Sequence, residues 1–312
     1  MGDSEELLAG LRASSDPRDP RASALLQPAG PESLENRVAI LGLPYDGGIP
    51  SRPGARFGPR ALREALAAFG TFDGRRDLEP LADLGDLSLP SMNGEEAHRR
   101  IEEGAARVFG SGARPIFIGG DHGCTGSVIR GLARARPALR LALVTIDAHL
   151  DVREYESPAA LSSGTPFRRA LETPILDGGS VGMIGIRRFA NSRHYLEWAE
   201  RQRIRLATVE EVGELGAAEV ARRVLAEVAG RVDGLYLSVD LDAADASVAP
   251  GVSALGIGGL CAREMIEIVR TVAAHPRLIG ADVMELSPPN DPDGRTARLA
   301  ARLLLEIAAA AG

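Results

Sequence analysis

Short apolar runs alternate with amphipathic stretches through most of this chain. The runs are continuously apolar, which is typical of strands buried on both faces of a sheet. They predict strands at residues 38–43, 115–119, 141–147, 181–186, 204–208, 235–241 and 278–286. Helical periodicity between them predicts helices at residues 58–69, 95–109, 123–135, 191–202, 216–230, 261–274 and 294–311. This alternation indicates an α/β fold with three layers, helices covering both faces of one sheet.

The first 36 residues differ in composition from the rest of the chain. They are rich in Pro, Ser, Asp and Arg, as in SSDPRDPRASALLQPAGPE, and predict a loosely ordered N-terminal arm with room for one short helix. Residues 37–312 show neither an internal repeat nor a break in composition. We therefore expect an arm over 1–36 and a single domain over 37–312.

Composition narrows the classes of partner. The 312-residue chain carries a formal net charge of -7, so it has no basic field for nucleic acid. No apolar run reaches membrane length, and the opening MGDSEELLAG lacks the order of a signal peptide. Cys124 and Cys261 form no disulfide framework, and all 36 residues counted as Lys or Arg are arginines, which excludes a catalytic lysine. We expect a cytoplasmic protein that binds neither nucleic acid nor membranes.

Acidic and histidine side chains follow three of the predicted strands at the point where each strand ends. They lie in the segments GGDHG (119–123), DAHLD (147–151) and SVDLD (238–242). Side chains two positions apart on a strand point the same way, and ligands of such sheets bind at the carboxyl ends of the strands. Any one segment could be an ordinary polar strand end. Together they predict one cluster of six side chains: His122, Asp147, His149, Asp151, Asp240 and Asp242.

This set of residue types points to a pair of metal ions. Four carboxylates and two imidazoles at neighbouring buried strand ends would repel one another without cations. Six ligands exceed the usual four of zinc, whereas two ions can share carboxylates. Oxygen-rich ligands with some imidazole favour Mn(II). Two such ions would ionise a bridging water at neutral pH and present it to a cationic electrophile.

The chain resembles the ureohydrolase family of arginases, agmatinases and formimidoylglutamases over roughly residues 37–311. The resemblance rests on GLPYDGG, RPGARFGPRALREAL, GGDHG, DAHLD, SVDLD and APGVSALGIGGL. It implies an arginase-like catalytic domain with a central eight-stranded, mostly parallel sheet. It also implies two Mn(II) ions per subunit and a homo-oligomer.

Position by position, the resemblance assigns the predicted ligands to two ions. One ion takes His122, Asp147, Asp151 and Asp240; the other takes His149, Asp147, Asp240 and Asp242. The resemblance also implies that Asp151 is a catalytic residue that would hydrogen-bond the bridging hydroxide, and we expect it to carry a proton. Glu285, in DVMELSPPND, matches the acid that holds the cationic amidinium or guanidinium group of the substrate. From its position alone, Glu285 would be a helix-start acid.

One departure bears on the substrate. Ser163, in SSGTPFRR, stands where arginases and agmatinases usually have a histidine that shuttles protons. The segments DAHLDVR, SSGTPFR, FANSRHY and APGVSA are instead similar to formimidoylglutamase, which splits N-formimidoyl-L-glutamate into L-glutamate and formamide in histidine degradation. Ser163 is therefore a candidate substrate-binding residue, and His194 is a candidate for the rest of the proton relay.

A substrate with two carboxylates needs arginines, which bind carboxylates in bidentate fashion. Arg153 lies two residues beyond Asp151 and is the preferred candidate; Arg168, Arg187 and Arg188 are weaker ones. The alternative for each is an ordinary surface arginine.

Three other functions fit the same residues. One is another ureohydrolase, such as agmatinase or guanidinobutyrase, which would release urea. A second is a deacetylase with a single zinc ion. A third is a metal-stabilised binding protein without turnover.

Overall fold

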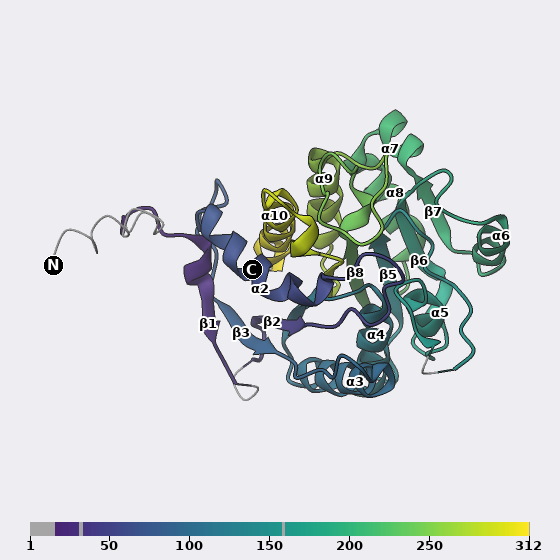
Figure 1. Ribbon diagram of the computed structural model, residues 1–312, viewed down its shortest axis with the longest axis horizontal. Helices are drawn as coiled ribbons and strands as arrows, with labels where there is room; N and C mark the ends of the chain where they lie inside the picture. Colours follow the sequence, from purple (N-terminus) through teal and green to yellow (C-terminus); the bar gives the residue numbers. More distant parts are fainter. Residues whose placement is uncertain (1–15, 31–33, 158–159, 312) are drawn as a thin grey trace.

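A single nine-stranded sheet forms the centre of the computed structural model, which describes residues 16–30, 34–157 and 160–311. The strands run in the order β1-β3-β2-β4-β9-β8-β5-β6-β7, and every pair of neighbours is parallel. Their bounds are β1 Leu26–Pro28, β2 Val38–Leu43, β3 Leu81–Asp86, β4 Arg114–Gly119, β5 Leu141–Ile146, β6 Leu176–Ile186, β7 Arg205–Thr208, β8 Gly234–Asp240 and β9 Leu278–Met284. All carboxyl ends therefore lie along one edge of the sheet (Figure 1).

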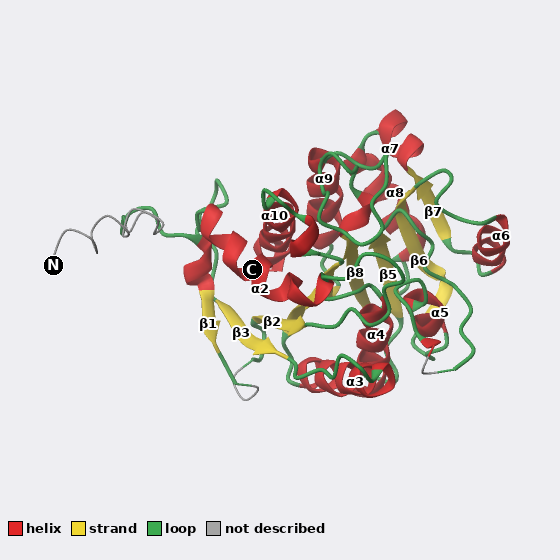
Figure 2. Cartoon of the chain, in the orientation of Figure 1, coloured by secondary structure: helices red, strands yellow, loops and turns green. Residues whose placement is uncertain are grey.

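Helices cover both faces of the sheet and complete three layers (Figure 2). One face packs on α2 (Gly58–Ala65), α8 (Ala217–Val228), α9 (Ala262–Ala273) and α10 (Arg295–Ala311). The other face packs on α3 (Gly94–Gly110), α4 (Gly123–Ala135), α5 (Pro166–Leu171) and α6 (Arg193–Arg201). Each face has its own apolar core. No helix in the described ranges is long and apolar enough to cross a membrane.

The continuous apolar runs explain why the strands were predictable. In β5 and β8 every residue is buried, because both faces of these central strands are covered. The two faces of β8 pack against different cores. Leu237 and Val239 of β8 face the core formed with α8 and α9, whereas Tyr236 belongs to the core on the α3 side. Side-chain alternation puts Asp240 on the same side as Tyr236.

The fold confirms the predicted three-layer α/β architecture and adds elements that apolar runs do not reveal. The strand β3 escapes prediction because its outer half is polar: Asp83 and Asp86 bind Arg63 of α2. The predicted helix 216–230 is preceded by a separate helix, α7 (Val209–Leu215). Gly216, with φ of 86°, separates α7 from α8.

The segment predicted as a loosely ordered arm is described at residues 16–30 and 34–36; residues 1–15 and 31–33 lie outside the described residues. The described part packs on the domain, which differs from a loose arm. Ala22 and Leu25, in a short 3-10 helix, are buried, and β1 pairs with β3. This short strand is the ninth of the sheet, one more than the eight that the family resemblance implied. The sequence did not reveal this packing, because the segment contributes few buried apolar residues and is rich in proline.

Candidate metal centre

Three strands place the predicted ligands at one spot. β4, β8 and β5 lead into the segments that contain the ligands; β8 pairs with β5, and β9 lies between β4 and β8 and leads to Glu285. Gly120, which follows β4, lets the segment that contains Tyr45 pack directly against the backbone at the end of β4. A side chain at this position would lie 1.9 Å from the carbonyl oxygen of Tyr45. The carbonyl of Gly120 also accepts a hydrogen bond from Glu285 N (2.9 Å), which ties the end of β9 to that of β4.

His122 is the centre of the first group of ligands. Its Nδ1 atom lies 3.0 Å from Oδ2 of Asp151, 3.0 Å from Oδ2 of Asp240 and 3.2 Å from Oδ2 of Asp147. One ligand atom from each of these four residues lies within 4.8 Å of the others. This is the set that the family resemblance assigns to one ion.

His149 is the centre of the second group. Its Nδ1 atom lies 3.1 Å from Oδ2 of Asp242 and 3.5 Å from Oδ1 of Asp147. Asp147 therefore belongs to both groups, as a bridging carboxylate must. The shared role predicted for Asp240 is not reproduced in the second group, which contains Asp147, His149 and Asp242.

Asp147, which follows β5, and Asp240, which ends β8, are oriented by the same kind of backbone turn. Oδ1 of Asp147 accepts a hydrogen bond from His149 N (2.6 Å), and Oδ1 of Asp240 accepts one from Asp242 N (2.8 Å). Each bond spans two residues and forms an Asx-type turn. In both aspartates the other oxygen, Oδ2, is left to face His122.

The protonation of the cluster shows how strongly its charges interact. Burial, and then the nearby carboxylate of Asp242, raise the pKa of Asp240 well above its usual value. Burial and the Asp147 charge raise the pKa of Asp151 to about 6. Burial alone would lower the pKa of His149, but the carboxylate of Asp242 and hydrogen bonds to Asp147 and Asp242 raise it to about 12. The cluster therefore attracts positive charge, whether protons or metal ions.

Two buried oxygen atoms test whether metal ions fit this site. Oδ1 of Asp242 has no hydrogen-bond partner among the described residues; Oδ2 of Asp147 makes no well-formed hydrogen bond either, although it lies 3.2 Å from Nδ1 of His122, and both oxygens are inaccessible to solvent. A buried carboxylate oxygen without a partner carries a desolvation cost that a bound cation offsets. The two histidines offer Nδ1, and the carboxylates offer unpaired oxygens. The donor set therefore fits divalent metal ions.

A second layer of hydrogen bonds fixes the orientation of His122. Its Nε2 atom lies 3.0 Å from Oγ of Ser238, and that hydroxyl donates to Oδ1 of Asp282 (2.6 Å). Asp282 is fully buried and also accepts hydrogen bonds from Thr125 and Tyr236. Because the Ser238 proton goes to Asp282, the Ser238 oxygen accepts from Nε2–H of His122. Nδ1 then faces the carboxylates, and once it has lost its proton its lone pair is directed at the position of a metal ion.

Glu285, the predicted substrate-binding acid, is buried beside His122. Its Oε1 atom accepts a hydrogen bond from His122 N (2.8 Å), and its Oε2 atom accepts one from the hydroxyl of Ser253. Burial, and then the charge of Asp240, raise the pKa of Glu285 well above its usual value. Glu285 therefore lies directly beside the cluster and not at a helix start.

Ser163 lies on a loop that packs against the cluster without contributing a ligand. Its backbone N–H donates to Gly48 O (3.1 Å), and Gly48 N donates to Oδ2 of Asp121 (2.8 Å), the residue before His122. The side chain of Ser163 is half-buried. The structure thus places Ser163 near the first ligand segment through Gly48 and Asp121.

Arg153 lines a cavity of about 280 Å³ that opens next to the ligands. The cavity wall contains His149, Asp151, Arg153, Asn191 and Tyr195, among others. Arg153 N donates to Gly164 O (2.9 Å), and the stem of the arginine packs on Gly164. Asn191 supports the same wall, because its amide accepts from Leu150 N (2.9 Å) and donates to Ala148 O (3.0 Å). These two bonds hold the backbone on either side of His149.

The weaker arginine candidates have different surroundings. Arg168 stacks on Trp198 at 3.9 Å and donates to Val152 O (3.0 Å), so it supports the loop and does not face the cavity. Arg188 is exposed above Phe189. Arg187 packs against Gly256, and its buried Nη1 atom has no hydrogen-bond partner among the described residues.

His194, the candidate for the proton relay, does not reach the cluster. It lies on the exposed helix α6, 3.8 Å from Glu154, and 64% of its side chain is exposed. It lies in the first turn of α6, beside Glu154.

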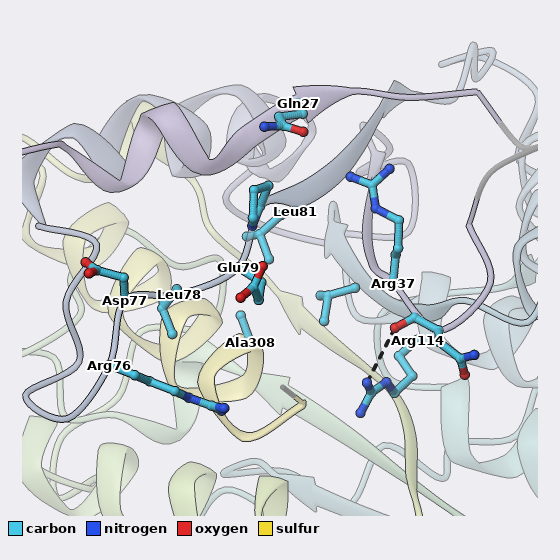
Figure 3. A pocket seen from close by; sticks show the side chains of 12 residues that line it. Gln27, Arg37, Arg76, Asp77, Leu78, Glu79, Leu81, Arg114 and Ala308 are labelled. Atoms are coloured by element: carbon cyan, nitrogen blue, oxygen red, sulfur yellow. Dashed lines mark hydrogen bonds between the residues drawn. The ribbon is translucent and has the colours of Figure 1, made fainter.

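A larger cavity, of about 370 Å³, lies at the other edge of the sheet (Figure 3). Its wall includes Arg37 and Arg114, at the amino ends of β2 and β4, together with Glu79. Arg114 donates to the carbonyl of Asn36 (3.5 Å). Neither group of potential metal ligands in the described part of the chain lies there. We therefore assign function to the carboxyl edge of the sheet, although its cavity is smaller.

The protein is thus of the α/β class, with a site at the carboxyl ends of its parallel strands that can hold metal ions. The model of the family described as Arginase matches residues 36–310, so the chain belongs to the arginase family of hydrolases. This confirms the resemblance drawn from the motifs.

Relatives within this family have different substrates. A guanidinobutyrase of Pseudomonas aeruginosa is 34% identical over 287 residues, which cover 90% of this chain and 87% of the relative. A formimidoylglutamase of Halobacterium salinarum is 34% identical over 305 residues, 96% of each chain. The solved structure of Trypanosoma cruzi formiminoglutamase with Mn²⁺ has a TM-score of 0.84 at 27% identity, covering 94% of this chain and 98% of that one. Sequence similarity alone therefore does not select one substrate.

Proposed function

We propose that this protein hydrolyses N-formimidoyl-L-glutamate to L-glutamate and formamide, with two Mn(II) ions bound by the cluster. The observation that carries the proposal is Arg153 in the cavity beside the cluster. Apart from the ligands His149 and Asp151, Arg153 is the one charged side chain among the described residues of that wall. A cation there suits a substrate whose tail bears carboxylates and repels the amine of agmatine.

The ligand set supports manganese as the metal. Four aspartates and two histidines form an oxygen-rich site, which suits Mn(II) better than a soft or four-coordinate metal. Asp147 reaches both histidines, so two ions would share it. The solved relative from Trypanosoma cruzi contains Mn²⁺. A single-zinc deacetylase would need only one of the two ligand groups.

In the proposed reaction, the chain orients the substrate and moves one proton. When bound by this cluster, two divalent ions would provide an ionised water and polarise the amidine. Glu285 orients the amidinium group by accepting its N–H protons. A C–O bond forms at the formimidoyl carbon, and its bond to the glutamate nitrogen breaks. Asp151 accepts the remaining proton of the attacking hydroxide and passes it to the leaving nitrogen.

Arg153 and Arg187 are the proposed carboxylate-binding residues. Arg153 lines the cavity, and the buried Nη1 of Arg187 is a hydrogen-bond donor without a partner among the described residues. Arg187 is close to the ligands along the backbone, since its N–H donates to Ala148 O (3.2 Å). Formimidoylglutamate has two carboxylates, and two arginines match that number.

The second candidate function is a guanidino-acid hydrolase that releases urea. The 34% identity to a guanidinobutyrase favours it, and one arginine would suffice for the single carboxylate of guanidinobutyrate. Ser163 separates this chain from ureohydrolases that use a histidine shuttle, but it does not separate these two substrates.

A product assay decides between the candidates. Protein loaded with Mn(II) is incubated with N-formimidoyl-L-glutamate, 4-guanidinobutyrate, agmatine or L-arginine, and formamide and urea are measured. We expect formamide from the first substrate and little urea from the others, with metal-stripped protein as the control. Urea from guanidinobutyrate without formamide would support the second candidate. No turnover of any of the four by protein that retains two ions would indicate a metal-stabilised binding protein.

A further inference from the structure

Ser253 occupies one oxygen of the substrate-binding acid. The hydroxyl of Ser253 donates a hydrogen bond to Oε2 of Glu285, while Oε1 accepts from His122 N. Ser253 is 6% exposed and Glu285 is 1% exposed, so the bond is shielded from water. The carboxylate thus faces the substrate with part of its accepting capacity already used.

The loop that carries Ser253 is fastened to the end of β9. Gly251 N donates to Oγ1 of Thr296 (2.9 Å), and Gly251 O accepts from Ser287 N (2.7 Å). A side chain at Gly251 would lie 2.4 Å from Cβ of Asp291, which shows how closely the loop packs on the segment before α10. Ser253 therefore lies two residues after Gly251, whose backbone is held by Ser287 and Thr296. Ser287 in turn lies two residues after Glu285.

The two candidate substrates differ at one substituent. The carbon to be attacked carries a hydrogen in a formimidoyl group and an additional NH₂ in a guanidino group. A guanidinium ion therefore brings one more donor group to a carboxylate than a formamidinium ion does. With a formimidoyl substrate, one side of Glu285 would lack a donor unless the protein supplied it.

We propose that Ser253 supplies that donor and thereby selects formimidoyl over guanidino substrates. This inference rests on the proposed function and deepens it. The hydroxyl satisfies Oε2 where a formimidoyl group offers only C–H. A guanidino group must either displace the buried hydroxyl or leave its own NH₂ without a partner, and both cost binding in the transition state.

A matched pair of substrates tests the proposal. N-formimidoyl-L-glutamate and N-carbamimidoyl-L-glutamate differ only in that H or NH₂, so the ratio of their kcat/KM values cancels the contribution of the glutamate part. The wild-type ratio should favour the formimidoyl compound. Ser253→Ala should lower that ratio by on the order of 10- to 100-fold, the effect of losing a hydrogen bond to a charged group. Ser253→Gly should lower it at least as far, because it also opens space for the NH₂.

Control variants separate a change in substrate selectivity from a loss of folding or of metal binding. Ser253→Thr keeps the hydroxyl and should retain most of the wild-type ratio. Ser247→Ala removes an exposed hydroxyl of the same loop, which bonds Asp245, and should leave the ratio unchanged. Thermal midpoint and metal content are measured for each variant. If Ser253→Gly fails to fold, Ser253→Ala decides, since it removes a single oxygen atom.

The outcomes distinguish this inference from the proposed function. A wild-type protein that prefers the guanidino compound overturns both. A wild-type protein that prefers the formimidoyl compound, with an unchanged ratio in a folded, metal-loaded Ser253→Ala variant, overturns the role of Ser253 alone.

Discussion

His122 and Asp240 meet across a strand that lies between them. They follow or end β4 and β8, which do not pair with each other, because β9 separates them in the sheet. Nevertheless Nδ1 of His122 lies 3.0 Å from Oδ2 of Asp240. Both side chains lean over the carboxyl end of β9, so the cluster depends on three strands keeping their order and length.

Asp147 is the residue whose loss should affect both ions. Its two oxygens lie 3.2 Å from Nδ1 of His122 and 3.5 Å from Nδ1 of His149. Asp147→Ala should lower kcat/KM at least about 1000-fold, because metal ions supply several kcal/mol of transition-state stabilisation. Elemental analysis should show fewer than two ions per chain. Asp233→Ala, at an exposed aspartate paired with Arg140, is the control. Full turnover with two ions in Asp147→Ala would contradict the scheme.

The hydrogen-bond chain behind His122 should affect metal affinity more than folding. Asp282→Asn replaces the acceptor of the Ser238 proton, so Ser238 no longer reliably accepts from Nε2 of His122. We expect affinity for Mn(II) to fall about 10- to 100-fold, as measured by metal titration against a chelator. Tyr236→Phe removes another bond to Asp282 and leaves Ser238 in place, so its effect should be smaller. An equal loss of Mn(II) affinity in both variants would argue against the assigned order of donors and acceptors from His122 through Ser238 to Asp282.

Metal binding should release protons. Despite burial, the carboxylates of Asp242 and Asp240 hold the pKa values of His149 and His122 above neutral, at about 12 for His149. A histidine binds metal in its neutral form, so each ion must displace a proton. Because these pKa values are raised, protons compete over the whole neutral range, and affinity should increase as pH rises. Calorimetric titration in buffers of different ionisation enthalpy measures the release. A binding enthalpy that is the same in every buffer would contradict it.

His98 should make the protein sensitive to acid. Burial, and then the charge of Arg169, lower its pKa from 6.5 to about 3. The native state thus disfavours protonation, so the stabilisation is complete above pH 6.5 and is lost as pH falls toward 3. The loss should reach about 1.4 kcal/mol per pH unit. In denaturant titrations, the difference in free energy of unfolding between His98→Gln and wild type should become smaller as pH falls through that range. His194→Gln, at an exposed site, should show no such change. Parallel curves for His98→Gln and wild type would refute the prediction.

Arg153 should act on substrate binding. Arg153→Met keeps the apolar stem on Gly164 but removes the charge from the cavity. We expect KM for N-formimidoyl-L-glutamate to rise roughly 10- to 100-fold with a smaller change in kcat. Arg188→Met, which alters an exposed arginine above Phe189, is the control. An unchanged KM in Arg153→Met would remove the main support for an acidic substrate.

The ligands were predictable because they follow the clearest signal in the chain. Each lies at the end of a continuous apolar run, and the spacing of two reports a shared face. His122, Asp147 and Asp240 therefore come together as expected. A carboxylate inside the apolar run LIGADVM could also have drawn attention to Asp282.

Contacts that depend on register or on irregular loops were not predictable. Ser238 meets Asp282 because these residues are directly opposite in the β8–β9 pair, and a register cannot be read from either strand alone. Ser253 reaches Glu285 through a loop without periodicity, and Asn191 holds the DAHLD segment from the loop between β6 and α6. The same limit applies to β3, whose polar half is stabilised by Arg63 of α2.

Asp151 and Glu285 share an uncommon backbone: their φ angles are 47° and 69°, in the left-handed region. Ordinary side chains pay conformational energy there, and asparagine tolerates it better than most. At these positions the chain keeps an acid where a glycine would be more comfortable. At Glu285, glycine would relax the backbone but leave His122 N and the Ser253 hydroxyl without their acceptor. The strained backbone is thus kept where the acid also satisfies its buried neighbours.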